Sequence, residues 1–373
     1  PVRVSPADAW TEASQVLHLT EAEQTFVFSA VTEEPRLSLF RDFSAPVKVN
    51  YAESDADLLF RLKHDSDGFN RWDAGQRLML NWINGAMVSD FTLSAAARET
   101  FVSLLNDSTL DPAMVTYLLS LPSEAYIATF SDVVDPQAIH AARKKVQLAI
   151  AASLQQEFID CYQRLTSAAP YAPEPAQMSA RALKNLALSY WVKTSAEGLQ
   201  AAKDQFAAAD NMTDQMAAMV AVVNSGNKDE AKALLASFYQ QWSGDSLVVN
   251  QWLSVQAGSA ELSSAAFIRS LQEHEAFDWR NPNKVRSVIG AFANQALVHF
   301  HATDGSGYEL LADAVLKLNT SNPQIAARLL GPLTKWKRLV PAQAELMKAQ
   351  LQRIMASGTL SKDVYEVVSK SLA

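Results

Sequence analysis

Cysteine and glycine are scarce in this chain, and both scarcities restrict its class. The 373 residues include a single cysteine, Cys161, so no internal disulfide can form. A lone thiol suits a reducing compartment, and we therefore expect a cytoplasmic protein. Only 12 glycines occur, which fits a helical array better than a chain rich in turns.

Long apolar runs and a basic surplus are absent as well. No uncharged apolar run reaches the roughly 18 residues that span a bilayer, and the N-terminus lacks a signal-peptide pattern, so we expect a soluble protein without a membrane partner. Its 40 acidic and 32 basic residues give a net charge of −8, which argues against nucleic acid as a partner. Two short basic runs, at 143–145 and 335–338, are predicted to be solvated helix faces.

Residues 1–52 have the pattern of β-strands. The stretches 15–20 and 25–28 are rich in β-branched and aromatic residues, and Val47, Val49 and Tyr51 alternate with polar residues. So few strands cannot close a sandwich by themselves. We therefore predict that residues 1–52 form the C-terminal strands of a β-sandwich domain.

From residue 53 to residue 373 the pattern becomes helical. Ser54 with Asp57 predicts a capped helix start, and Asp-Pro at 111–112 and 135–136 predicts two more. A helix from Lys228 carries an apolar stripe at three-to-four spacing: Ala231, Leu234, Leu235, Phe238 and Trp242. These features predict a mainly α fold, a long superhelical array of antiparallel helix pairs of the armadillo or HEAT kind.

Two segments of the array, 281–290 and 322–331, are variations of one another. Each opens with Asn-Pro, a cap followed by proline at the first helical position, and each then carries an arginine beside an apolar stripe. Arg286 and Arg328 lie 42 residues apart, within the period of about 40–47 residues of stacked helical-pair repeats. Equivalent positions of successive repeats project from one face, so the two arginines are candidates for a shared concave surface.

The arginines have two possible kinds of partner. Arginine early in a helix is disfavoured by the helix dipole and usually has a carboxylate nearby. That carboxylate is either an internal Asp or Glu, or a ligand carboxylate gripped by the guanidinium fork. Gln324 lies one turn before Arg328 on the same side. The sequence leaves both alternatives open.

Other candidate motifs have plainer interpretations. His274-Glu275 begins a zinc-peptidase motif, but Asp278 occupies the position of its second histidine. His299 and His301, followed by Asp304, are predicted to be histidines of a polar turn. No metal-ligating or catalytic residue is therefore predicted in this chain.

Three further features are predicted to be structural. Cys161 lies in an apolar helical context and is predicted to be a buried thiol. The segment 304–308 is glycine-rich without the lysine of a phosphate loop, and is predicted to be a turn that caps a helix. Arg71 is predicted to pair with Asp67 or to stack near Trp72.

Taken together, six stretches closely resemble the C-terminal part of the bacterial aminopeptidase N family, zinc peptidases of the gluzincin group. The resemblance covers essentially the whole chain and is found in the following stretches: 23–28, 43–49, 69–74, 211–214, 281–292 and 304–308.

The resemblance implies a fold and a role. It implies that residues 1–52 belong to an Ig-like sandwich and that residues 53–373 form a helical cap over the active site with an internal cavity. It also implies that Arg286, Gln324 and Arg328 face this cavity and contact peptide substrates. The zinc and its H-E-x-x-H motif would belong to the parent enzyme's catalytic domain, a partner of this chain, so the chain alone is predicted to be inactive.

A different class of function remains as an alternative. A free-standing helical-repeat scaffold would bind other proteins through its concave face. An in-frame H-E-x-x-H upstream of Pro1 would distinguish the two interpretations in favour of the peptidase.

Overall fold

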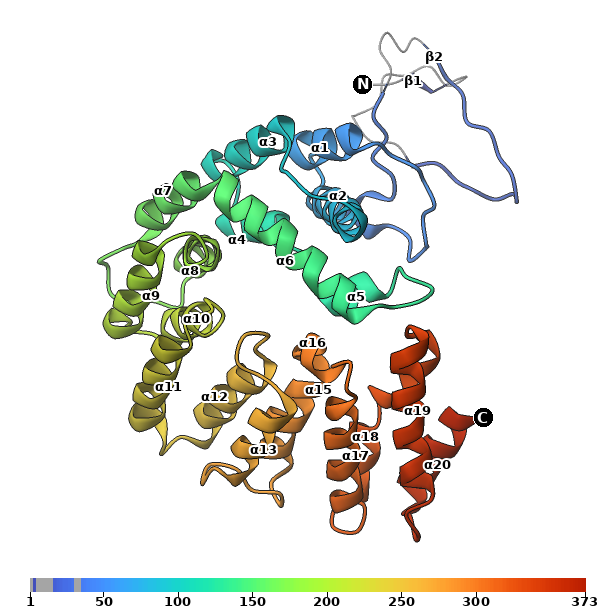
Figure 1. The fold of residues 1–373 in the computed structure, drawn as a ribbon. Coiled ribbons are helices and arrows are strands. Elements are labelled where there is room, and N and C mark those ends of the chain that lie inside the picture. The colour runs from blue at the N-terminus through green and yellow to red at the C-terminus, as the bar shows by residue number, and fades with distance from the viewer. Residues whose placement is uncertain (1–2, 5–15, 30–34) are drawn as a thin grey trace.

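The computed structural model describes residues 3–4, 16–29 and 35–373, and its helices follow one another along a curved path (Figure 1). Figure 1 shows α6, α8 and α10 on the inner side of this arc and α7, α9 and α11 on its outer side. The mainly α repeat fold predicted from the sequence is confirmed. The α-helices are α1 (Asp55–His64), α2 (Gly68–Val88), α3 (Ala95–Asn106), α4 (Pro112–Leu119), α5 (Glu124–Ala128), α6 (Pro136–Ser153), α7 (Gln155–Leu165), α8 (Pro175–Trp191), α9 (Ala196–Ala208), α10 (Met212–Val223), α11 (Lys228–Trp242), α12 (Ser246–Gly258), α13 (Ala265–Glu273), α14 (Pro282–Val285), α15 (Ala291–Gln295), α16 (Leu297–Phe300), α17 (Ser306–Leu318), α18 (Pro323–Leu329), α19 (Pro341–Met355) and α20 (Lys362–Leu372).

Three short helical segments of other types complete the described helices. Two are 3-10 helices, η1 (Arg41–Phe43) and η3 (Leu333–Arg338). The third, η2 (Arg286–Gly290), is a π-helical turn between α14 and α15. Such turns insert one residue into a helix and often mark functional sites.

The predicted helix starts are present. Ser54 accepts a hydrogen bond from the Asp57 amide, and the Asp57 carboxylate accepts one from the Ser54 amide, which is a complete capping box at α1. Asp111 and Asp135 cap α4 and α6, each followed by proline at the first position. The stripe of α11 is buried at four of its five positions, and these four side chains pack into the core: Ala231, Leu234, Leu235 and Phe238.

The N-terminal segment contains less regular β-structure than its sequence pattern predicts. Strands β1 (Arg3–Val4) and β2 (Phe28–Ser29) pair antiparallel, with Arg3 opposite Ser29. The strands predicted at 16–20 and 47–51 are wrong, because these residues form no ladder; residue 15 lies outside the described residues. A strand requires a hydrogen-bonded partner, and here Val47 and Val49 remain exposed instead of packing against a second sheet.

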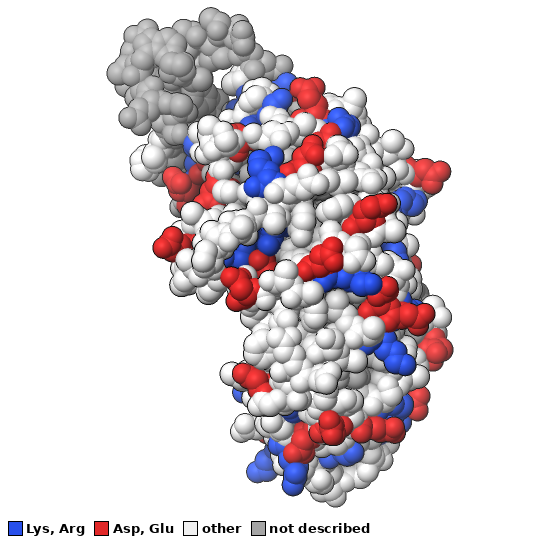
Figure 2. All heavy atoms as spheres, turned by 90° about the vertical axis from the view of Figure 1, so that its left-hand side faces the viewer, with Lys and Arg blue, Asp and Glu red and all other residues white. Residues whose placement is uncertain are grey.

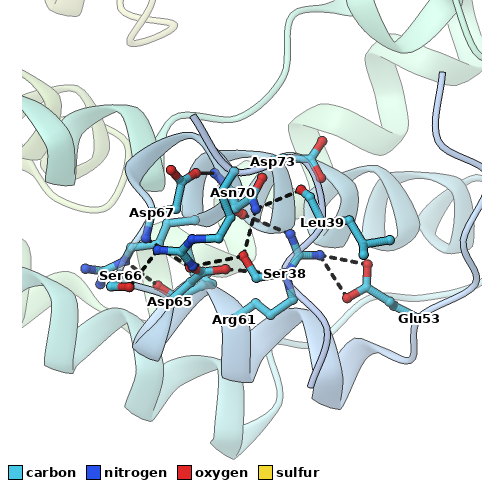
Figure 3. A network of polar contacts seen from close by, with 12 residues as sticks. Ser38, Leu39, Glu53, Arg61, Asp65, Ser66, Asp67, Asn70 and Asp73 are labelled. Atoms are coloured by element: carbon cyan, nitrogen blue, oxygen red, sulfur yellow. Dashed lines mark hydrogen bonds and ion pairs between the residues drawn. The ribbon is translucent and has the colours of Figure 1, made fainter. Parts of the chain in front are cut away.

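A polar network fastens residues 38–53 to the first two helices (Figure 3). The buried Arg61 donates from Nη1 to both carboxylate oxygens of Glu53, at 2.8 Å each. From α2, the Asn70 side chain donates to Ser38 Oγ at 2.7 Å and to the Leu39 carbonyl at 2.9 Å. The entry into the helical array is therefore held by paired and hydrogen-bonded groups rather than by apolar packing alone.

Arg71 corrects one prediction at this junction. It does not pair with Asp67; its Nε donates to the Leu62 carbonyl at 3.0 Å and its Nη2 to the Lys63 carbonyl at 3.2 Å. These carbonyls lie in the last turn of α1, where no N–H group of the helix donates to them. Asp67 instead caps α2 by accepting from the Asn70 amide at 2.7 Å.

Two distant parts of the array meet and close the arc. The Val134 amide donates to the Arg338 carbonyl at 2.7 Å, and the Val340 amide donates to the Val134 carbonyl at 3.0 Å. Nearby, the Gln137 amide group donates to the carbonyls of Val298 and His301 at 2.8 and 3.0 Å. The segment between α5 and α6 is thus joined to the C-terminal helices across more than 160 residues of sequence.

The surface of the array carries charges of both signs. Figure 2 shows the side that lies at the left of Figure 1, where acidic and basic side chains are interspersed without a field of one sign. Among the described residues, no helix is both long and apolar enough to cross a membrane.

Candidate substrate-binding pocket

The two Asn-Pro segments form equivalent helix starts. Asn281 accepts from the Asn283 amide at 2.9 Å and begins α14, and Asn322 accepts from the Ile325 amide at 3.2 Å and begins α18. Pro282 and Pro323 each occupy the first helical position, where a missing N–H costs no hydrogen bond. Both copies therefore begin with an asparagine cap and a proline, although the cap accepts from the second residue of α14 and from the third residue of α18.

The apolar stripes turn the two arginines outward. Val285, Ile289 and Phe292 are fully buried. On the second copy, the buried positions are Ile325, Leu329 and Leu333. Arg286 and Arg328 lie beside these stripes and are exposed, as the helical periodicity predicts.

Both arginines line one pocket, which we call the arginine pocket. Its volume is about 520 Å³, and α12, η2, α15 and α18 supply its walls. No Asp or Glu is among the described residues that line it, so its charged side chains are both cationic. The lining residues are Ser254, Arg286, Ser287, Gly290, Ala291, Asn294, Gln295, Ile325, Arg328 and Leu329.

Neither arginine is neutralised inside the fold. Arg286 donates from Nη1 to the Asn283 side-chain oxygen at 2.8 Å, which is a neutral acceptor. Within the described residues no carboxylate lies within 4.0 Å of the guanidinium of Arg286 or Arg328. Of the two partners that the sequence left open, the internal carboxylate is therefore not present in the described part. The planar guanidinium forks remain available to an anionic ligand.

Gln324 lies outside this lining. It is exposed in the first turn of α18, one helical turn before Arg328, but it is not one of the residues that surround the arginine pocket. Its predicted contact with peptide stays a prediction.

The histidines serve packing and hydrogen bonding. His274 packs against the rings of Tyr239 and Trp252, and its Nδ1 accepts from the Ala276 amide at 3.1 Å. Asp278 is engaged separately by Arg280. The described residues contain no group of three His, Cys, Asp or Glu side chains that could hold a metal ion, so these residues do not fit a zinc site.

His299 and His301 are half-buried, whereas the prediction of a polar turn implies exposed histidines. His299 Nε2 lies 2.8 Å from the Ala260 carbonyl, and His301 Nδ1 lies 2.9 Å from the Tyr308 hydroxyl. Burial, with a smaller contribution from Lys335, lowers the pKa of His301 to about 4. His301 is therefore neutral near pH 7 and fixes the turn before α17.

The remaining structural predictions hold. Cys161 is fully buried, and burial raises the pKa of its thiol to about 11, so it is not a nucleophile. The segment 304–308 turns into α17: the Asp304 carboxylate accepts from the Ser306 amide, and Gly305 adopts a φ of 74°. Gly307 approaches the Phe300 carbonyl so closely that a Cβ would lie 2.3 Å from its oxygen.

The basic runs are solvated in part, since Lys144, Lys335, Lys337 and Arg338 are exposed, but three of their side chains also hold the fold together. Arg143 is half-buried and lines a second pocket, and Lys145 donates from Nζ to the Ala86 and Ser89 carbonyls at the end of α2. Arg338 donates from Nη2 to the carbonyls of Ala128 and Ser131, at 2.8 Å each. Their partners lie far away in the sequence, so no local pattern indicates these roles.

Comparison with protein families divides the chain into two matches. Residues 55–373 match the family described as a domain of unknown function (DUF3458_C) with ARM repeats. Residues 2–52 match the domain of unknown function (DUF3458) with an Ig-like fold.

Known proteins extend this finding. The chain is 35% identical to aminopeptidase N of Escherichia coli (strain K12) over 367 residues, and 35% identical to that of Haemophilus influenzae over 364 residues. Both alignments cover 96% of this chain and 42% of the relative, so the chain spans less than half the length of these proteins.

A solved structure agrees with these relatives. The crystal structure of Legionella pneumophila aminopeptidase A in complex with aspartic acid superposes with a TM-score of 0.81 at 30% identity, covering 89% of this chain and 40% of that one. The resemblance read from the sequence is therefore confirmed. The chain belongs to the DUF3458_C family of ARM-repeat domains and corresponds to the C-terminal part of aminopeptidase N-like proteins.

Proposed function

We propose that this chain is the non-catalytic part of a zinc aminopeptidase, which caps the active site and binds peptide substrates in its internal cavity. One observation carries the proposal: Arg286 and Arg328 extend from successive repeats into one pocket, and no carboxylate of the described residues neutralises them. Two guanidinium groups in a pocket without acidic lining favour an anionic or carbonyl-rich ligand. A peptide offers both kinds of group.

The chemistry of hydrolysis would lie outside this chain. Zinc, where the parent enzyme binds it, polarises a carbonyl and activates water. The residues of this chain would act on the substrate at a distance from that step, by holding its downstream part and by shielding the cavity from bulk water. Binding of this kind changes the Michaelis constant more than the turnover number.

The test replaces both arginines in the whole enzyme that contains this chain. In the Arg286→Ala, Arg328→Ala variant we expect the Michaelis constant for tetrapeptides to rise by about tenfold, equivalent to about 1.4 kcal/mol, while that for a single-residue chromogenic amide stays nearly unchanged. The proposal requires that a peptide, and not a single-residue amide, reaches the arginine pocket.

Two controls accompany this measurement. Arg280→Ala removes an exposed arginine whose one ion-pair partner among the described residues is Asp278, and it should leave both Michaelis constants unchanged. The purified chain alone should hydrolyse neither substrate. Equal effects of the double replacement on peptide and amide would refute the binding role, and hydrolysis by the chain alone would refute its non-catalytic assignment.

A further inference from the structure

A second pocket lies beside the arginine pocket, and we call it the basic pocket. Its volume is about 320 Å³, and it is lined by residues of α6, α8 and α10, which form the inner side of the arc (Figure 1). Gln295 lines both pockets, so they share a wall. The two pockets are therefore neighbours.

The two acidic residues of the basic pocket already have partners. Glu124 Oε1 lies 2.7 Å from His140 Nδ1, and Glu261 Oε1 lies 2.6 Å from Lys144 Nζ. The second pair joins α6 to the turn after α12. Neither carboxylate forms an ion pair with the other cations of the pocket.

Arg143 and Lys193 are the cations that lack a carboxylate. Arg143 donates from Nε to the Pro122 carbonyl at 2.7 Å, and Lys193 donates from Nζ to the Asn224 carbonyl at 3.1 Å. Within the described residues, no carboxylate lies within 4.0 Å of either group. Both side chains are half-buried, so water compensates their charge only in part.

The surroundings of Lys193 oppose its charge. Burial lowers the pKa of Lys193, the Glu261 carboxylate counteracts this effect, and the charges of Lys144 and Arg143 lower the pKa further. Like charges held close together are costly, and an anion between them removes that cost. A bound anion beside Arg143 and Lys193 would therefore be stabilised.

We propose that the basic pocket is a carboxylate-binding subsite, in which Arg143 and Lys193 hold the carboxylate of a peptide whose preceding residues occupy the arginine pocket. The inference rests on the proposed function for the nature of the ligand. The carboxylate is that of the peptide C-terminus or of an acidic side chain, and both form charge-assisted hydrogen bonds with the two cations.

The test measures peptide binding to the full chain by calorimetry. The probes are tetra-alanine with a free C-terminal carboxylate, the same peptide as its amide, and the amide of Ala-Ala-Asp-Ala. We expect the free acid to bind about tenfold more tightly than the tetra-alanine amide. If the amide of Ala-Ala-Asp-Ala also binds more tightly than the tetra-alanine amide, the subsite accepts acidic side chains. If the two amides bind equally, the subsite is specific for the C-terminus.

Replacing Lys193 shows whether the preference for the free acid over the amide depends on this cation. In Lys193→Met the acid should bind hardly more tightly than the amide, while the affinity for the amide stays the same. Lys193→Arg should restore the preference for the acid. Lys203→Met, which removes a lysine paired with Glu230 away from both pockets, should preserve it. Recovery in the arginine variant also excludes simple misfolding.

The outcomes separate this inference from the proposed function. If the acid preference survives in Lys193→Met and vanishes in Arg328→Gln, the carboxylate binds in the arginine pocket; the subsite is then wrong, and the proposed function stands. Equal binding of acid and amide, or no binding of either, overturns the subsite. Loss of the preference in Lys193→Met supports the subsite even if the arginine pair proves irrelevant to peptide turnover.

Discussion

Several basic side chains of this protein donate hydrogen bonds to backbone carbonyls. Arg71 and Lys145 donate to carbonyls at the ends of α1 and α2, where the helix dipole is negative and the backbone lacks partners. Arg338 does the same for the turn after α5. The Arg328 side chain makes no hydrogen bond to the described residues, and this contrast supports the proposal that it binds ligand.

His301 provides a test at the scale of one residue. Burial lowers its pKa to about 4, whereas an unfolded histidine titrates near 6.5. Between these values the unfolded chain binds a proton that the folded chain does not, so stability falls as the pH decreases from 6.5 to 4. We expect the wild type to lose up to about 3 kcal/mol more than His301→Gln over this range. Urea unfolding at several pH values measures the difference.

Carboxylates titrate in both the wild type and His301→Gln, so the difference between the two stability curves reports on His301 alone. His18→Gln is the matched control, because it removes an exposed histidine and leaves His301 in place. Parallel stability curves for the wild type and His301→Gln would show that His301 is not kept neutral by the fold.

At the scale of elements, the sequence predicts what depends on neighbours in the chain. The caps at Ser54, Asn281 and Asn322 were predictable because a cap involves residues two or three positions apart. The absence of a strand at 47–51 was not predictable, because a strand depends on a partner that the local sequence pattern does not contain. The outward direction of Arg286 followed from periodicity, whereas its place in a π-helical turn had no signal in the sequence.

The candidate sites divide in the same way. The arginine pocket was partly predictable, since a repeat offset of 42 residues relates Arg286 to Arg328. The basic pocket was not, since no periodicity connects Arg143 of α6 with Lys193 in the turn after α8. Its run at 143–145 resembles any solvated helix face, and only the arrangement of α6 beside α8 and α10 encloses it.

The capping box of α1 gives a test at the scale of an element. Ser54→Ala removes the hydroxyl that accepts from the Asp57 amide, so we expect α1 to lose about 1 kcal/mol of local stability. Amide hydrogen exchange should show faster opening of residues 55–58. Ser246→Ala is the control, because the Ser246 hydroxyl makes no hydrogen bond to the described residues and this serine is exposed in the first turn of α12. Unchanged exchange in α1 would contradict a stabilising cap.

At the scale of the molecule, closure of the arc keeps the two pockets together. Residues 128–137 contact both the 338–340 segment and the turn after α16. Helix α6, which carries Arg143 into the basic pocket, begins directly after this contact. The position of Arg143 relative to Gln295 therefore depends on a closure that joins residues 128–137 to residues far along the chain.

Arg338 is the side chain through which this closure can be tested. Arg338→Ala removes two charged-donor hydrogen bonds, to Ala128 and Ser131, each worth about 1.5–3 kcal/mol. We expect faster amide exchange at 128–134 and 338–340 with little change in α8 to α11, because each repeat packs mainly on its neighbours. Lys337→Ala, whose ammonium contacts only the neighbouring Trp336 ring among the described residues, should leave exchange at both segments unchanged. If the arginine variant exchanges like the wild type, the backbone bridge at Val134 holds the arc by itself and Arg338 does not contribute to the closure.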